Sequence, residues 1–422
     1  MALVAFVAVL PLEWTTVGGV AGGFIKPFHI AAIVFVGFCL ARWRPGRVVG
    51  PVWHRHYKIF AAYFVVLAVT LAASVARPDP VLPRDLVLRQ LMYAATAVFV
   101  AGCLVLILNR PAQRALAATG AIATVVLLAV FGVALVQQHI NPFTLLRNAF
   151  TQANPDIISY QLLRAVFRTD LDLPEVAANL RHKVFIGLLI AIFVGLACAA
   201  ILERQHRLLR ATVTVSSVIG FSLVLLSLSR STILCMGAPL LLYLLRLLVT
   251  ARARPAQAFG LVVALAATLA AVASPLGTLL TARFSDTASY TARLTAAGPS
   301  FLDQFGPAAL LGTTSSAVGT TPHNSILNAW LAGGVLAAIP AAVMMVAFVL
   351  TWLREAHRYV TDGPGWKLWV EPLWILAVGA TFIVRSFTSG NQFHMVDLMA
   401  MAVFLGATFA NERATVSSRE SR

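Results

Sequence analysis

From Arg283 to Gly334 the chain reads RFSDTASYTARLTAAGPSFLDQFGPAALLGTTSSAVGTTPHNSILNAWLAGG, the longest polar interruption in an apolar C-terminal half. Apolar runs of roughly 17 to 25 residues recur on both sides of it, long enough to cross a bilayer as helices. Within lipid only helices and closed barrels satisfy their own backbone, and barrel strands alternate polar and apolar residues instead of running apolar. The sequence therefore predicts an all-α polytopic membrane protein that forms a single integral membrane domain over residues 1–422.

The composition supports the same class. Hydrophobic residues make up 59% of the 422-residue chain and charged residues only 11%, whereas a soluble domain has about 25% charged residues. The net charge of +16 would suggest nucleic acid as a partner of a soluble protein, but loop topology accounts for most of it here and we expect no nucleic-acid partner. The four cysteines fall inside apolar runs without metal-ligand spacing, so no metal site or disulfide framework is expected.

The apolar runs predict about twelve helices. Their predicted spans are Ala2–Leu12, Pro27–Ala41, Ile59–Val75, Leu86–Leu108, Leu116–Val136, Val184–Leu202, Thr212–Leu228, Thr232–Thr250, Phe259–Leu280, Ser325–Trp352, Pro372–Phe387 and Met395–Phe409. Two long polar segments separate these helices, residues 137–182 and 281–324, and a short polar tail, expected to be disordered, covers residues 412–422.

Lysine and arginine are concentrated in alternate short loops, which indicates the cytoplasmic side of a membrane protein. The basic loops are residues 42–58, 110–114, 204–210, 246–254 and 354–367. This pattern predicts a multi-pass protein of the cytoplasmic (inner) membrane with both termini and the tail in the cytoplasm. Both long polar segments then lie outside.

Of the 32 lysines and arginines, 13 fall on the predicted outer side, where the positive-inside rule does not explain them. Three of these, Arg230, Arg283 and Arg293, form a candidate group with His323. Arg230 lies between two apolar helices with almost no loop, a position that costs several kcal/mol on insertion scales unless the charge is paired or reaches water. A guanidinium can bind a phosphate through two hydrogen bonds, so the group suits a diphosphate. The alternatives are an arginine that snorkels at a turn and arginines that solvate an external loop.

His323 stands directly before a predicted helix start. An imidazole accepts a proton near neutral pH and could activate a hydroxyl nucleophile, although a histidine in this position is more often a loop or capping residue. Asn324 or Ser325 is expected to cap the helix, whose N-terminus would add a partial positive charge. The run from Gly312 to Gly319 would let backbone approach a ligand closely.

These elements follow one another in an order that resembles a known family. The elements are Ser229-Arg230 at a helix junction, Arg283, the SYTAR sequence of residues 289–293, Leu310-Leu-Gly312, the HNSIL sequence of residues 323–327, and Gly333-Gly334. Together they are similar to the bacterial O-antigen ligase and O-antigen polymerase superfamily. The chain departs from that pattern in having no second glycine just after Gly312, and in having Ala332 where an acidic residue often precedes the glycine.

The resemblance implies a GT-C-like membrane glycosyltransferase that moves a glycan from a polyprenyl diphosphate to an acceptor hydroxyl at the outer face, with inversion and without a metal or other cofactor. It implies that residues 281–324 form the catalytic loop, that Arg230 and Arg293 bind the diphosphate with help from Arg283, and that His323 activates the acceptor. Ser229, Asn324 and Arg385 are further candidates for the site. The expected partners are a lipid-linked glycan donor, a lipid- or envelope-linked acceptor and membrane lipids.

Three alternatives remain open at this stage. A polymerase of the same superfamily shares these motifs. A flippase or exporter of an anionic lipid-linked glycan would also need arginines in a cavity, although it would usually show paired repeats, which the sequence lacks. Other GT-C enzymes use acidic residues of an early external loop to bind a metal or act as base, and Asp79 and Asp85 stand in such a loop beside Arg77 and Arg84.

Overall fold

The computed structural model describes residues 1–14, 27–108, 110–137, 141, 143–144, 147, 174–203, 206–226, 229–250, 310–314, 324–361, 369–388 and 394–420. The regular elements in these ranges are all helices: α1 (Ala2–Ala8), η1 (Leu10–Trp14), α2 (Pro27–Arg42), α3 (Pro45–Ala76), α4 (Arg84–Ile107), α5 (Arg110–Ala117), α6 (Thr119–Gln137), α9 (Pro174–Ala199), α10 (Arg207–Leu226), α11 (Arg230–Thr250), α16 (Ser325–Gly333), α17 (Val335–Thr361), α18 (Pro372–Thr388) and α19 (Met395–Glu420).

Seven helices within the described ranges are long and apolar enough to cross a membrane. They contain Pro45–Ala76, Arg84–Ile107, Pro111–Gly132, Arg207–Leu225, Arg230–Thr250, Val335–Thr361 and Met395–Ala414. The all-α membrane class is therefore confirmed. The total of twelve spans stays a prediction, because the predicted helix Phe259–Leu280 lies outside the described residues and three other apolar helices are shorter than this criterion.

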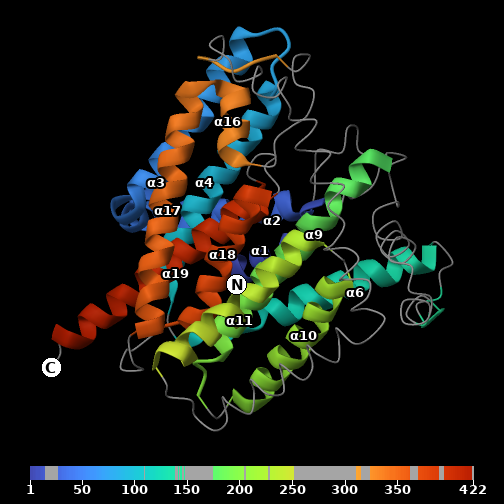
Figure 1. The fold of residues 1–422 in the computed structure, drawn as a ribbon. Helices are drawn as coiled ribbons and strands as arrows, with labels where there is room; N and C mark the ends of the chain where they lie inside the picture. Colours follow the sequence, from blue (N-terminus) through green and yellow to red (C-terminus); the bar gives the residue numbers. More distant parts are fainter. Residues whose placement is uncertain are drawn as a thin grey trace.

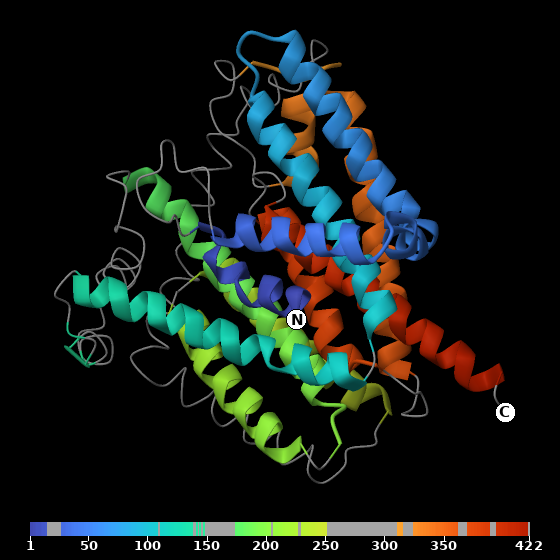
Figure 2. The same ribbon diagram turned by 180° about the vertical axis from the view of Figure 1, so that it is seen from behind.

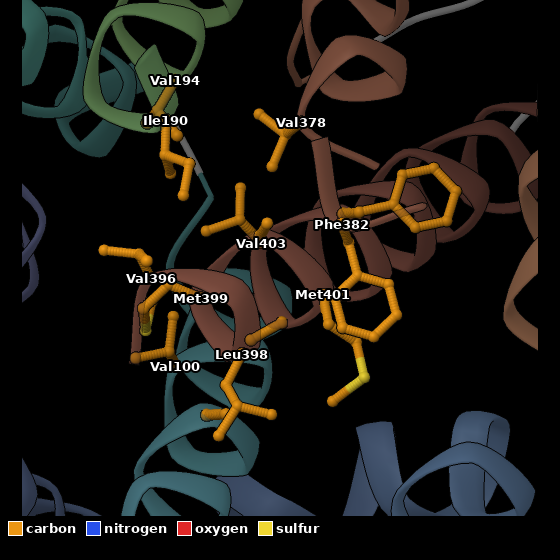
Figure 3. Close-up of a cluster of buried hydrophobic side chains, with 14 of the residues drawn as sticks. Val100, Ile190, Val194, Val378, Phe382, Val396, Leu398, Met399, Met401 and Val403 are labelled. Atoms are coloured by element: carbon orange, nitrogen blue, oxygen red, sulfur yellow. The ribbon is translucent and has the colours of Figure 1, made fainter. Parts of the chain in front are cut away.

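The helices form two groups with a third between them (Figures 1 and 2). One group contains α3, α4, α16 and α17, and the other contains α6, α9 and α10. Between them lie α18 and α19, which contact both groups, together with α11. The side chains that cover α19 come from α4, α9 and α18, and Figure 3 shows Val100, Ile190 and Phe382 around its methionines. This central position makes α19 the most enclosed of the candidate spans.

Several predicted boundaries were wrong. The third helix begins at Pro45 instead of Ile59 and carries a kink at His56 (φ −114°, ψ 18°). The predicted helix Leu116–Val136 is divided between α5 and α6. The segment 137–182 was predicted as one polar connection, but α9 already begins at Pro174. The tail was expected to be disordered after Glu412, whereas α19 continues to Glu420.

The most consequential difference concerns the predicted helix Ser325–Trp352. It is broken at Gly334, whose backbone (φ 69°, ψ −163°) cannot continue a helix. The nine-residue α16 and the long α17 then lie side by side as a hairpin (Figures 1 and 2). Because α16 is short, its first residue lies well inside the helix assembly instead of at its end.

Gly312 fastens the closed end of this hairpin. The Thr313 amide donates to the Leu331 carbonyl at 2.9 Å, and a Cβ on Gly312 (φ 91°) would come within 2.6 Å of the same oxygen. Thr314 also forms an antiparallel bridge with Pro80, in the connection between α3 and α4. At Gly312 the close backbone approach is thus made to another part of the chain, while residues 315–319 of the same run lie outside the described residues.

Candidate functional site

Arg230 is the first residue of α11, and the residue before it shapes the helix start. The Ser229 hydroxyl is buried and lies 2.7 Å from the Thr232 hydroxyl, while the Ser229 carbonyl accepts from the Ile233 amide at 2.9 Å. A cation at a helix N-terminus opposes the helix dipole, which favours negative charge there. An anion bound beside the half-buried Arg230 would therefore be attracted both by the guanidinium and by the helix N-terminus.

The start of α11 lies against the C-terminal half of α18. Cys235 of α11 contacts the Thr381 side chain and lies near enough to Arg385 to feel the charge of its guanidinium. Thr381 and Arg385 are four residues apart on α18, so they share one helix face. The first turns of α11 thus adjoin the Arg385 end of α18.

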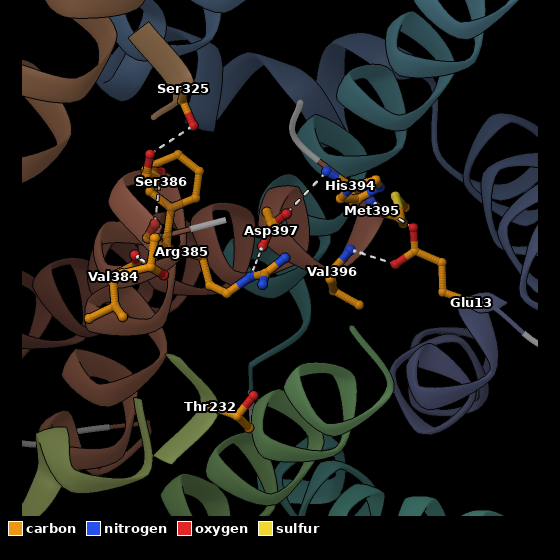
Figure 4. Close-up of polar contacts among 12 residues, drawn as sticks. Glu13, Thr232, Ser325, Val384, Arg385, Ser386, His394, Met395, Val396 and Asp397 are labelled. Carbon is orange, nitrogen blue, oxygen red and sulfur yellow. Dashed lines mark hydrogen bonds and ion pairs between the residues drawn. The ribbon is translucent and has the colours of Figure 1, made fainter. Parts of the chain in front are cut away.

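Arg385 is held in a buried ion pair. Its Nε donates to Asp397 Oδ1 at 3.0 Å, with the two side chains 1% and 7% exposed. The other carboxylate oxygen, Asp397 Oδ2, accepts from the His394 amide at 3.1 Å and so caps the start of α19 (Figure 4). An ion pair this deep is costly to desolvate and is retained only with good geometry and further hydrogen bonds.

The start of α16 reaches the same place. Asn324, one of the two residues expected to cap this helix, is its N-cap, and Asn324 Oδ1 accepts from the amides of Ile326 at 2.9 Å and Leu327 at 3.3 Å. The next residue, Ser325, donates its hydroxyl to the Ser386 carbonyl at 3.1 Å (Figure 4). Ser386 follows Arg385 directly, so α16 begins beside the arginine end of α18.

The predicted site is only partly within the described chain. Arg283, Arg293 and His323 lie outside the described residues. Arg230, Ser229, Asn324 and Arg385 are described, and their helices all meet at the C-terminal end of α18. His323 directly precedes Asn324, the N-cap of α16. The described position of Asn324 therefore marks where the chain enters this helix.

Sequence reasoning missed two acidic residues at this site. Glu13 of η1 accepts from the amides of Met395 and Val396, both at 3.1 Å, and Asp397 binds Arg385. Both carboxylates are almost fully buried. A signal was present, since Glu13 is the single acidic residue before Asp79 and both Glu13 and Asp397 interrupt apolar runs. Ionisable residues in such runs are functional candidates by default.

Of the two acidic residues in the early loop, Asp85 has a local structural role. Asp85 lies in the first turn of α4, a favourable place for a carboxylate at a helix N-terminus. Among the residues that the structure describes, no group of three or more His, Cys, Asp or Glu side chains could hold a metal ion. Comparison with protein-family models and with curated proteins finds no match to this chain.

Proposed function

We propose that this protein is a membrane glycosyltransferase of the O-antigen ligase-like kind. It transfers a glycan from a polyprenyl-diphosphate donor to an acceptor hydroxyl at the outer face of the cytoplasmic membrane, without a metal and with inversion at the anomeric carbon. In this proposal the complete chain has about twelve membrane helices in a GT-C-like arrangement.

The observation that carries the proposal is the meeting of two helix starts beside α18. The α11 start presents Arg230. The α16 start lies two residues after His323, and its N-terminus points into the assembly. Two helix N-termini and a guanidinium make a region suited to a phosphate group. A half-length helix whose N-terminus faces an anionic group inside the membrane is a recurring arrangement in membrane transport proteins.

The residues have distinct roles in the transfer. Arg230, together with Arg293 and Arg283, binds the diphosphate and stabilises the negative charge that develops as it departs. His323 accepts the proton of the acceptor hydroxyl. The acceptor oxygen then bonds to the anomeric carbon from the side opposite the diphosphate, the bond from that carbon to the phosphate oxygen breaks, and polyprenyl diphosphate leaves.

The test uses the purified full-length protein in lipid nanodiscs with a synthetic polyprenyl-diphosphate oligosaccharide and a panel of acceptors, followed by mass analysis of the products. Wild type should give an acceptor enlarged by the intact oligosaccharide. His323→Ala should abolish the product at unchanged protein abundance, and Arg230→Ala should weaken donor binding. Arg210→Ala is the matched control, since Arg210 is exposed on α10, and it should act as wild type does.

The rival functions give other results. Lengthening of the oligosaccharide on the donor lipid itself would identify a polymerase. Movement of the lipid-linked glycan across proteoliposome membranes with no covalent product would identify a transporter. Full activity of His323→Ala would remove His323 from the mechanism.

A further inference from the structure

The start of α19 is held by a residue from the opposite end of the chain. Glu13 accepts the Met395 and Val396 amides through its two carboxylate oxygens, each at 3.1 Å, across 382 and 383 positions. The first amides of any helix lack partners within the helix, and a side chain immediately before it usually supplies the acceptor. Asn324 does so for α16. For α19 the chain uses instead a buried carboxylate of η1, which is 2% exposed.

Capping α19 with the buried Glu13 carboxylate has a cost in free energy that a neighbouring cap would avoid. A buried carboxylate loses its hydration, and an amide or hydroxyl beside the helix would satisfy the same amides at lower cost. What the long-range contact adds is a fixed distance between η1 and α19. The geometry thus anchors the first turn of α19, the helix that also carries Asp397.

From that turn two further contacts lead to α16. Asp397 binds Arg385 Nε at 3.0 Å and so fixes the end of α18 relative to the start of α19. The residue after Arg385, Ser386, accepts the Ser325 hydroxyl at 3.1 Å through its carbonyl. Every polar member of this route is buried except the half-buried His394, whose amide Asp397 also binds. Figure 4 shows the succession from Glu13 to Ser325.

We infer that Glu13 is a positioning residue for the start of α16. It acts through α19, the Asp397–Arg385 pair and the Ser386 carbonyl, and so fixes the helix that follows His323. That Glu13 fixes the start of α16 is inferred from these contacts alone. The effect of Glu13 on glycan transfer rests on the proposed function.

The fixing of α16 by Glu13 is tested by hydrogen exchange of the full-length protein in nanodiscs. Glu13→Gln keeps the size of the side chain but removes its charge. It should speed amide exchange in α19 residues 395–398 and also in α16 residues 326–329, by about fivefold to tenfold, the effect of losing a hydrogen bond. Ser325→Ala, at the other end of the route, should speed exchange in α16 alone, and the double variant should add little more in α16.

The matched control is Glu355→Gln. Glu355 pairs with Arg358 at 2.8 Å on α17, outside the route from η1 to α16. It should leave exchange in α16 unchanged. Faster exchange at α19 in Glu13→Gln with α16 unchanged would overturn the inference, because the effect of Glu13 would then end at its own contact.

The effect of Glu13 on glycan transfer is tested on the reaction itself. Misplacing the helix after His323 should lower kcat about tenfold to a hundredfold, while KM for the donor changes little because Arg230 is untouched. Equal loss of kcat in the Glu355→Gln control would indicate general destabilisation and refute a positioning role. If the wild-type protein transfers no glycan, the proposed function fails while the exchange experiment still decides the inference.

Discussion

Glycine at position 102 is required by the contact of two membrane helices. A Cβ built on Gly102 of α4 would overlap the Val48 carbonyl of α3, a backbone group that cannot rotate away. Gly102→Ala must therefore push α3 from α4, and overpacking of this kind costs about 1 to 3 kcal/mol or more. The midpoint of thermal unfolding in detergent should fall clearly. Gly37→Ala is the control, since a Cβ there meets nothing within 4 Å and should be neutral or slightly stabilising.

The buried Arg385–Asp397 pair predicts a second effect at single residues. Asp397→Asn removes the carboxylate charge that faces the guanidinium, and breaking a buried pair from one side typically costs about 3 to 5 kcal/mol. Replacing both partners, as in Arg385→Met with Asp397→Leu, should recover much of this stability.

The control for that experiment is Glu412→Gln. Glu412 pairs with Arg55 and Arg358 at 3.4 and 3.2 Å where the side chains are partly exposed, and such pairs contribute about 0 to 1 kcal/mol. Chemical unfolding of the three variants and of wild type in mixed micelles provides the comparison. A stable Asp397→Asn variant would show that the pair contributes nothing to the fold.

At the scale of elements, α16 and α17 show where a sequence pattern is insufficient. The residues from Ser325 to Trp352 are apolar enough to predict one long helix. The break arises because Gly334 adopts a backbone conformation that favours glycine. Close to it, the Thr313 amide donates to the Leu331 carbonyl from outside the helix. Local propensity contains no information about that contact. The Asn324 cap was predictable because its hydrogen bonds are local.

Gly334→Ala tests the hairpin. An alanine at φ 69° and ψ −163° is strained by about 1 to 3 kcal/mol, so the variant should unfold at a lower temperature. Gly237→Ala in α11, where a Cβ meets nothing within 4 Å, should not. If the Gly334 variant is as stable as wild type, α16 and α17 can form one continuous helix.

The start of α18 predicts a pH dependence. Glu371 precedes this helix, and its amide donates to the Ala197 carbonyl at 2.8 Å. Burial raises the pKa of its carboxyl group, which Arg246 offsets only in part. The folded protein then binds more protons than the unfolded chain between the ordinary pKa of about 4.3 and the raised value, so stability falls as pH rises through this window.

Glu371→Gln removes that contribution. The variant should show a flatter dependence of its unfolding midpoint on pH from about 4 upward, measured side by side with wild type in one detergent. An unchanged slope would mean that the Glu371 carboxyl has the same proton affinity in the folded and unfolded chain.

For the molecule as a whole, composition and apolar run length were enough to predict an all-α membrane protein. The lipid bilayer requires apolar side chains, and its thickness sets the length of a spanning helix. Composition and run length could not predict which helices meet. The site candidates were basic residues on the side of the membrane where the positive-inside rule does not expect them. That criterion selected Arg230 and Arg385 but assigned no role to Asp397 or Glu13. Those two residues matter through contacts across 12 and more than 380 positions, and contacts between such distant residues emerge only when the helices are placed in space.

The orientation of the whole molecule is testable from two exposed arginines, Arg84 and Arg207. The 24 residues of α4 extend about 36 Å, from Arg84 to the connection into α5. The end of α9 packs against α5 and the start of α6, where Gly195 adjoins Ala117, and α10 begins soon afterwards. Arg84 and Arg207 are therefore at opposite ends of the helix assembly.

An impermeant maleimide should then label Arg84→Cys in intact cells and label Arg207→Cys only after permeabilisation, because the positive-inside rule puts the basic loop 204–210 in the cytoplasm. The four native cysteines are buried, so they add little background. The 20 residues of α10 extend about 30 Å, so Arg230, which follows α10, lies on the same side of the membrane as Arg84. A donor would enter from that side. The reverse labelling pattern would put Arg230 toward the cytoplasm, where transfer to an acceptor at the outer face is impossible.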